Sequence, residues 1–193
     1  MKSVFIKKNK NQLYDGSQLT PLYTYQNYKV SGDSIISWVG PCRVSLEHMV
    51  DYEDKIAHEL ICGDLMLHFM IEVFPSQLAF GVSLQRIFAS LAMDLIQELT
   101  PVKMSTRRSG DDIYVTFPKK NEGKLSISIA SVSAVSTMIH FALNITNDGT
   151  PVKTASLNDL KIDAEKFSKK LMNAFCKEYE SILFATVKVK PLA

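Results

Sequence analysis

The sequence predicts an α+β protein in which a β-sheet packs against helices. Short β-prone runs fill the first forty residues, three alternating strands follow between residues 111 and 146, and two long stretches carry apolar residues at helical spacing. The chain has 193 residues, of which 46% are hydrophobic and 22% are charged, so it is long enough for one substantial core. We therefore expect a single domain over residues 1–193.

The N-terminal forty residues indicate strands joined by hairpins. The β-prone runs cover residues 3–8, 22–30 and 34–40. Asp15-Gly16 and Gly32-Asp33 lie between these runs and can adopt the positive backbone angles that tight turns need. We expect Pro41 to close the third run.

Two helices and a buried strand are expected in the middle of the chain. Apolar residues from Leu46 to Ile61 follow helical spacing, with Ser45 as a candidate N-cap. The mostly apolar run at residues 64–74 predicts a buried strand that Pro75 ends. A wide apolar stripe at residues 76–99 predicts a long helix, which Thr100-Pro101 stops.

Three strands and a last helix complete the expected pattern. The strands cover residues 111–117, 124–131 and 137–146. Ser156 and Asp159 form a capping-box pattern, and a long helix is expected to begin near Asp163. Its predicted buried face consists of Phe167, Leu171, Phe175, Tyr179 and Ile182. The alternating residues 186–190 predict an exposed edge strand.

One face of the three strands carries short polar side chains. By strict alternation, Lys124, Ser126 and Ser128 share a face, and His140 and Asn144 occupy a similar face of the following strand. The intervening isoleucines then belong to the core. An antiparallel sheet often exposes one polar face to solvent, so a solvated sheet and the floor of a ligand site both remain open interpretations.

Charged residues flank this polar face. Arg107, Arg108, Asp111 and Asp112 precede or open the first strand, and Lys124 opens the second. An exposed Lys–Asp pair adds only about 0–1 kcal/mol of stability, so folding gives little reason to place one here. Lysine can bind a phosphate or a developing oxyanion, aspartate can orient an amine or a metal ion, and arginine can make planar contacts with phosphate or carboxylate. Taken singly, each residue is also compatible with a charged turn in water.

Charge and composition argue against several functional classes. A formal net charge of +2 is too small to indicate bulk nucleic acid or an anionic membrane as a partner. The longest apolar run is shorter than a membrane span, and the first residues lack the features of a signal peptide, so we expect a cytoplasmic protein. The three cysteines are widely separated, and His48, His58 and His68 recur every ten residues, which matches no common metal-site spacing. No metal site is predicted.

Four motifs within residues 63–145 resemble, in order, the catalytic region of lipoate and biotin protein ligases. They are GDLMLHFM, GDDIYV, GKLSISIA and IHFALNI. Over nearly its whole length, through motifs such as YDGS, MVDYED and RRSGDDIYV, the chain also resembles the family named domain of unknown function 366. That family is thought to share the ligase fold, which is also the catalytic fold of class II aminoacyl-tRNA synthetases. The resemblance implies a mixed, largely antiparallel sheet with helices packed on one side.

The resemblance also implies roles for particular residues. In the ligases the matching lysine contacts the acyl carbonyl and the adenylate phosphate, which makes Lys124 and Asp112 the candidate catalytic residues. The candidate binding residues are Arg107, Arg108, Asp111, Ser126, Ser128, His140 and Asn144. ATP with Mg²⁺ is the implied cofactor, and a small carboxylate or a nucleotide is the implied ligand. An acceptor protein, a tRNA end and a homodimer are compatible partners.

One departure from the ligase pattern concerns the adenylate. The ligases hold it under a glycine-rich loop ahead of the strand matched by LMLHFM, whereas this chain has EDKIAHELICGD at that place. Two functions therefore stay open. The first is an acyl- or adenylate-handling ligase or acyltransferase that acts on a small carboxylate. The second is a noncatalytic module that binds a nucleotide, an acyl group or a tRNA end. A purely structural role leaves the short polar face unexplained.

Overall fold

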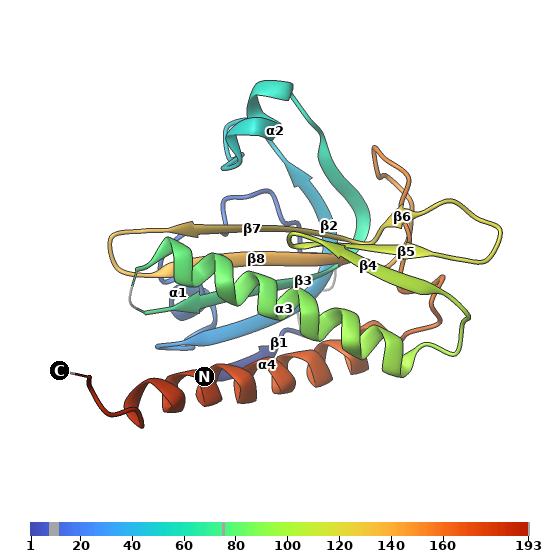
Figure 1. Ribbon diagram of the computed structural model, residues 1–193. Helices are drawn as coiled ribbons and strands as arrows, with labels where there is room; N and C mark the ends of the chain where they lie inside the picture. Colours follow the sequence, from blue (N-terminus) through green and yellow to red (C-terminus); the bar gives the residue numbers. More distant parts are fainter. Residues whose placement is uncertain (8–11, 75, 193) are drawn as a thin grey trace.

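The fold is built on one five-stranded sheet, seen in a computed structural model that describes residues 1–7, 12–74 and 76–192 (Figure 1). The strand order across this sheet is β1 (Lys2–Phe5), β2 (Ser34–Val44), β3 (Ile61–Val73), β8 (Thr137–Asn144) and β7 (Ser126–Val132). β1 pairs with β2 in parallel and the other neighbours are antiparallel. The sheet is therefore mixed and largely antiparallel, as expected.

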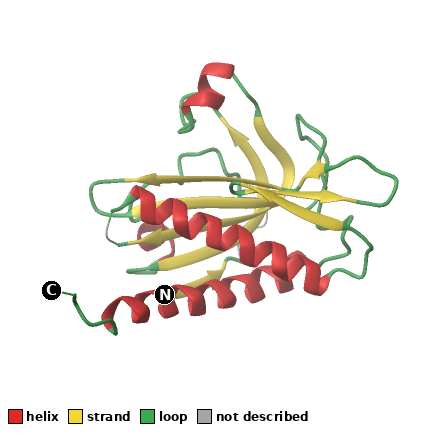
Figure 2. Cartoon of the chain, viewed as in Figure 1, coloured by secondary structure: helices red, strands yellow, loops and turns green. Residues whose placement is uncertain are grey.

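A second, three-stranded antiparallel sheet lies beside β7 (Figure 2). It consists of β4 (Ser105–Ser109), β5 (Asp112–Thr116) and β6 (Gly123–Lys124). Leu125 joins the two sheets, because its N–H donates to the Ile113 carbonyl of β5 while its own carbonyl accepts from the Asn144 N–H of β8. Both sheets are thereby fixed to each other at residue 125.

Two long helices cover one face of the five-stranded sheet (Figure 1). α3 (Leu78–Leu99) and α4 (Ala164–Val187) bury their apolar stripes there, and the Phe88 ring meets Phe69, Phe141 and Phe175 edge-on with centroids 5.1 Å apart. α3 is long and apolar enough to cross a membrane by length and composition, but Leu84, Phe88 and Ala92 are fully buried against the sheet. α3 is thus the central core helix of the domain.

The opposite face of the sheet carries a smaller core. Tyr14, Trp38, Met66 and Met70 form its buried centre, together with Ile36, Cys42 and Ala142. α1 (Tyr23–Tyr28) packs two tyrosines against this cluster, whereas α2 (Tyr52–Ala57) buries no residue and stands above β2 and β3 at the top of Figure 1. This second face is where the cleft described below opens.

The longest sequence patterns are confirmed. The predicted strands at residues 34–40, 64–74, 111–117 and 137–146 and both long helices are present, with ends that differ by a few residues. Asp163 caps α4 by accepting the Lys166 N–H at 2.8 Å. The predicted buried face of α4 is buried, apart from Ile182, which is partly buried against the core. β1 overlaps the run predicted at 3–8 but begins one residue earlier, at Lys2; Lys8 and Pro75 lie outside the described residues.

The strand predicted at residues 22–30 is wrong, because this segment forms α1. Leu22 and Lys29 at its ends adopt left-handed backbone conformations, which lie outside the extended region of a regular strand. The buried Glu72 carboxylate accepts the Leu22 N–H at 2.7 Å, which fixes the start of the helix. Tertiary contacts thus override the β propensity of the tyrosines.

The helix predicted at residues 46–61 is also wrong for most of its length. Only Tyr52–Ala57 is helical, and its N-cap is Asp51 rather than Ser45, since the Asp51 carboxylate accepts the Glu53 N–H at 2.8 Å. Most of the apolar residues that suggested the helix, such as Leu46 and Ile56, are exposed, whereas Met49 is buried and Ile61 packs against the second core. Their spacing therefore does not trace one buried helix face.

Three smaller predictions are wrong as well. Pro41 does not close a strand, because β2 continues through it with an irregularity between Gly40 and Cys42. Residues 186–190 form no edge strand, since α4 runs to Val187 and no strand lies beside the residues that follow. The single strand predicted at 124–131 is two strands, β6 and β7, which meet at Leu125 and pair with different partners.

The break at Leu125 reverses the predicted faces of β7. Ser128 pairs with Phe141 and therefore faces the helices, whereas Ile127 pairs with Ala142 and faces the second core. The expectation that Ile127 belongs to the helix-side core and that Ser126 and Ser128 share a face with His140 is wrong. A one-residue change of register exchanges the faces of every later side chain in a strand.

Candidate functional site

The candidate site is a cleft with two lobes on the sheet face opposite α3 and α4. The narrow lobe has a volume of about 60 Å³ and the wide lobe a volume of about 410 Å³. Both lobes are lined by Asp51, Asp54, Ile61, Ile127 and Ser128, so the two lobes adjoin each other. Tyr14 and His140 line the narrow lobe, and Lys124 lines the wide one.

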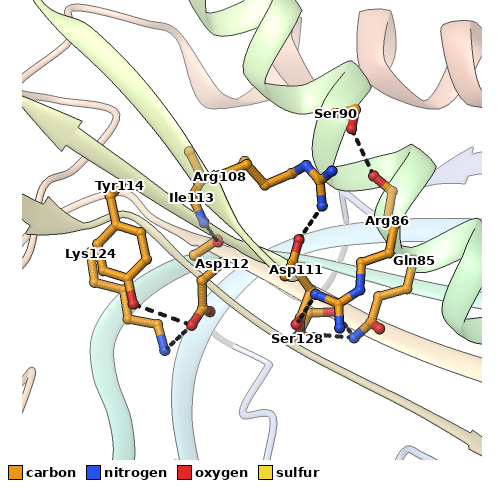
Figure 3. Close-up of polar contacts among 12 residues, drawn as sticks. Gln85, Arg86, Ser90, Arg108, Asp111, Asp112, Ile113, Tyr114, Lys124 and Ser128 are labelled. Carbon is orange, nitrogen blue, oxygen red and sulfur yellow. Dashed lines mark hydrogen bonds and ion pairs between the residues drawn. The ribbon is translucent and has the colours of Figure 1, made fainter.

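Lys124 and Asp112 form an ion pair in the wide lobe. Lys124 Nζ lies 2.9 Å from Asp112 Oδ2, with exposed fractions of 30% and 25% for the two side chains. Figure 3 shows Lys124 and Tyr114 both pointing toward Asp112, and the Tyr114 hydroxyl lies 3.5 Å from the same carboxylate. The ammonium group is therefore held in place at the cleft surface while part of it stays open to a ligand.

The backbone of Lys124 is fixed by neighbouring segments. Its N–H donates to the Lys153 carbonyl, and its carbonyl accepts from the Ala155 N–H and from Asn144 Nδ2 at 3.1 Å. Asn144 also donates to the Ala155 carbonyl at 3.2 Å. Asn144 lines the wide lobe, but its amide N–H groups are used in hydrogen bonds to the backbone at Lys124 and Ala155.

Asp111 lines the wide lobe but is held from the opposite side by α3. Arg86 Nη1 donates to Asp111 Oδ1 at 2.8 Å, and Gln85 Nε2 donates to Asp111 Oδ2 at 2.9 Å (Figure 3). Burial raises the pKa of the Asp111 carboxyl above its ordinary value, although Arg86 acts in the opposite direction. Although they are neighbours in sequence, Asp111 is therefore bonded to Arg86 and Gln85 of α3, whereas Asp112 is paired with Lys124.

The two serines also line the wide lobe while their hydroxyls bond within the fold. Ser126 Oγ accepts the Ile113 N–H at 2.8 Å. Ser128 Oγ donates to the His140 carbonyl at 2.8 Å and accepts from Gln85 Nε2 at 2.9 Å. These hydrogen bonds link the two sheets and α3 to one another.

Arg107 and Arg108 are not brought into the cleft. Both belong to β4, a strand that the sequence analysis did not anticipate. Arg107 makes a two-point ion pair with Glu122, with nitrogen–oxygen distances of 2.6 and 3.0 Å, and its guanidinium lies over the Tyr114 ring. Arg108 contacts the Gly110 carbonyl and borders a groove beside α3.

His140 lies at the narrow end of the cleft inside an aromatic stack. Its ring is parallel to that of Tyr14, with centroids 3.5 Å apart, and His140 Nε2 lies 3.0 Å from His68 Nδ1. Trp38 stacks on the far side of His68 with centroids 5.0 Å apart. Burial lowers the pKa of both histidines, that of His68 to about 4.

Sequence reasoning missed the acidic residues that α2 brings to the cleft. Asp51, Asp54 and Glu59 line the wide lobe, and burial raises the pKa of Asp54, to which neighbouring Asp51 contributes. Their only signal in the sequence was the acidic run around MVDYED, which carries no spacing typical of a known site. Among the described residues, no group of three or more histidine, cysteine or carboxylate side chains could hold a metal ion.

Fold and cleft define a class of protein with an α+β architecture of the biotin and lipoate protein ligase type. The chain belongs to the family described as domain of unknown function DUF366, whose family model matches residues 1–190. A protein of unknown function from Pyrococcus horikoshi is 34% identical and has a TM-score of 0.91, with 99% of this chain and 98% of that chain covered.

Two ligases share the fold at low sequence identity. The biotin protein ligase of Aquifex aeolicus, in complex with biotin and ATP, is 10% identical with a TM-score of 0.56, covering 91% of this chain and 69% of that one. A bipartite lipoate protein ligase of Thermoplasma acidophilum is 10% identical with a TM-score of 0.53, covering 91% and 83%. At this identity the likeness establishes the fold alone.

Proposed function

We propose that this protein binds a small carboxylic acid or its acyl derivative in the two-lobed cleft, as an acyl-handling ligase or acyltransferase does. The observation that carries the proposal is the Lys124 ammonium group, which is held by Asp112 at 2.9 Å beside a lobe of about 410 Å³. An ammonium group has three N–H donors, and Asp112 occupies one of them. The remaining donors can bind a carboxylate or carbonyl oxygen without breaking the pair.

Acyl transfer places developing negative charge on a carbonyl oxygen, and a preorganised cation stabilises that charge. Lys124 is suited to this role because its backbone is fixed by Asn144 and by residues 153 and 155. Asp112 is a positioning residue in this proposal, since it orients the ammonium group. The low identity to the ligases adds support for the fold and none for a particular substrate.

The residues of the wide lobe fit a nucleoside triphosphate poorly. Its lining contains the carboxylates Asp51, Asp54, Glu59, Asp111 and Asp112 and the single cation Lys124. A triphosphate carries several negative charges, so it meets more like-charge repulsion near these carboxylates than a ligand with one carboxylate does. Arg107 is ion-paired with Glu122 and does not line the lobe. We therefore derive no step through ATP or Mg²⁺.

The same acidic lining favours a second candidate, a noncatalytic module that binds an acyl group. An adenylating enzyme needs cationic groups around the phosphates. Here the segment that stands in place of the ligases' glycine-rich loop instead brings Asp54 and Glu59 to the cleft. A module that only binds the acid has no such need.

Thermal shift and native mass spectrometry with small carboxylic acids, biotin, lipoate and ATP test the proposal. A bound acid at a hundred times its Kd stabilises the protein by about 2.7 kcal/mol. We expect this shift in the parent and in the control Lys177→Met, which removes an exposed lysine on α4, and not in Lys124→Met. An equal shift in Lys124→Met removes Lys124 from the site. Release of pyrophosphate from ATP and acid would identify an adenylating ligase, and its absence together with acid binding favours the noncatalytic candidate.

A further inference from the structure

A chain of hydrogen bonds fixes the tautomers of the two buried histidines. His68 Nε2 lies 3.1 Å from the Gly40 carbonyl, which can only accept, so Nε2 carries the proton of His68. In a neutral ring the other nitrogen, His68 Nδ1, is then an acceptor. His140 Nε2, 3.0 Å away, must donate to it. The neutral His140 ring therefore has its lone pair on Nδ1.

Both rings are neutral near pH 7. His68 and His140 are 0% and 2% exposed, and burial places the pKa of His68 at about 4 and that of His140 well below its ordinary value. Each ring therefore carries one proton, as the chain from Gly40 requires.

His140 Nδ1 has no hydrogen-bond partner within residues 1–7, 12–74 and 76–192. Among these residues, the side-chain polar atoms that are both fully buried and unpaired are Ser37 Oγ and Ser168 Oγ. Nδ1 does not belong to this set, and His140 lines the narrow lobe while the residue is 98% buried. The unpaired acceptor therefore belongs to a ring at the wall of that lobe.

The remaining walls of the narrow lobe are mainly apolar. Val44, Ile61, Ile127 and Ile129 line it, together with the Tyr14 ring that stacks on His140. His48, Asp51 and Asp54 add polar groups to the wall. Its volume of about 60 Å³ is well below the roughly 150 Å³ of an engineered cavity that binds benzene. The lobe accommodates a small group with an apolar flank.

We infer that the acid bound in the cleft carries a hydroxyl or amino group that donates a hydrogen bond to His140 Nδ1. This inference rests on the proposed function for the carboxylate end of the ligand and names the chemistry of its other end. An unsubstituted acid leaves the buried Nδ1 without a partner, and sites built around such a hydrogen bond reject analogues that lack it. The preferred ligand is thus a short hydroxy or amino acid rather than a plain fatty acid.

Matched acids test the inference. We would measure Kd for linear acids of three to six carbons, each with a terminal methyl, hydroxyl or amino group, on the parent and on His140→Phe. The phenylalanine ring keeps the stack on Tyr14 but removes the acceptor. We expect one substituted acid to bind at least tenfold more tightly than its unsubstituted match in the parent, and less than twofold in the variant. Equal affinities in the parent overturn the inference and leave the proposed function intact.

A second measurement does not depend on the carboxylate or on the folding of the variant. Nitrogen-15 NMR of the parent separates the ring nitrogens of its four histidines, and we expect His140 to be protonated on Nε2 alone. 1-Propanol, which can donate a hydrogen bond, should move the Nδ1 resonance, whereas propionitrile, which cannot, should not. A proton on Nδ1, or no response to 1-propanol, overturns the inference. A response to 1-propanol without binding of any acid retains the inference about His140 and refutes the proposed function.

Discussion

The buried histidine pair makes the stability of this protein sensitive to acid. Burial lowers the pKa of His68 from 6.5 to about 4, and that of His140 in the same direction. A group whose pKa is lower in the folded state stabilises the fold fully above its unfolded pKa and loses that contribution as the pH falls. The stabilisation is therefore complete above about pH 6.5 and declines toward pH 4.

The magnitude follows from the two pKa values of His68. The His68 ring has a pKa of 6.5 in the unfolded chain and about 4 in the folded chain. Its titration therefore lowers the unfolding free energy by about 2 kcal/mol when the pH falls from 7.5 to 5. His140 adds to this loss in the same direction. With a urea dependence of about 2 kcal/mol per molar, the unfolding midpoint should fall by about 1 M or more.

Urea unfolding at pH 7.5 and pH 5 measures the effect. The double variant His68→Phe/His140→Phe keeps aromatic rings between Trp38 and Tyr14 but has no titrating group there. It should be less stable than the parent at pH 7.5, because it loses the bond to the Gly40 carbonyl, and should lose less on acidification. Comparison with this variant cancels other titrations.

The control is His58→Asn, which changes an exposed histidine at the C-cap of α2, where asparagine tolerates the left-handed backbone. It should lose as much stability on acidification as the parent. If the parent and the double variant lose the same stability between pH 7.5 and pH 5, the reasoning about the buried pair is refuted.

Three further substitutions probe contacts outside the narrow lobe, each checked by urea unfolding. Gly149→Ala should destabilise the protein more than Gly32→Ala. Both glycines have left-handed backbones, in which an alanine costs about 1–2 kcal/mol. Of these two sites, Gly149 is the one where the new methyl group would collide with a neighbouring carboxylate, that of Asp64. Equal losses would contradict this. Tyr179→Phe should cost about 1 kcal/mol, because its hydroxyl donates to Asp33 at 2.7 Å; no change would exclude a contribution from that bond. For Asp111→Asn, the unfolding free energy of the variant minus that of the parent should be larger at pH 7 than at pH 3. Burial raises the pKa of Asp111, so its ionised form lowers the stability of the parent at pH 7. A smaller difference at pH 7 would contradict that shift.

The sequence predicted the elements whose pattern is imposed by one extended buried surface. α3 and α4 each cover the same sheet along more than twenty residues, so their apolar residues repeat at helical spacing over many turns. The apolar residues at 46–61 showed a similar spacing, although most of them are exposed and the buried Met49 lies outside α2. Periodicity records burial only where a partner surface exists.

The candidate site was only partly predictable for a related reason. Lys124 and Asp112 lie in contact as the hairpin suggested, since β5 and β6 are close in the chain. The faces of β7 were not predictable, because the break at Leu125 depends on bonds to Ile113 and Asn144 that come from two different strands. Strict alternation contains no information about such a junction.

This junction also determines what the cleft can recognise. Because the break turns Ile127 and Ile129 toward the cleft and commits the hydroxyl of Ser128 to the fold, the floor between the lobes offers little hydrogen bonding to a ligand. The ammonium of Lys124 and the Nδ1 atom of His140 retain unused hydrogen-bonding capacity, and the carboxylates of Asp51, Asp54 and Glu59 also line the cleft. In our proposal, recognition depends on the distance between Lys124 and His140. The cleft is suited to select a ligand by its two polar ends and its length, with an apolar segment between them.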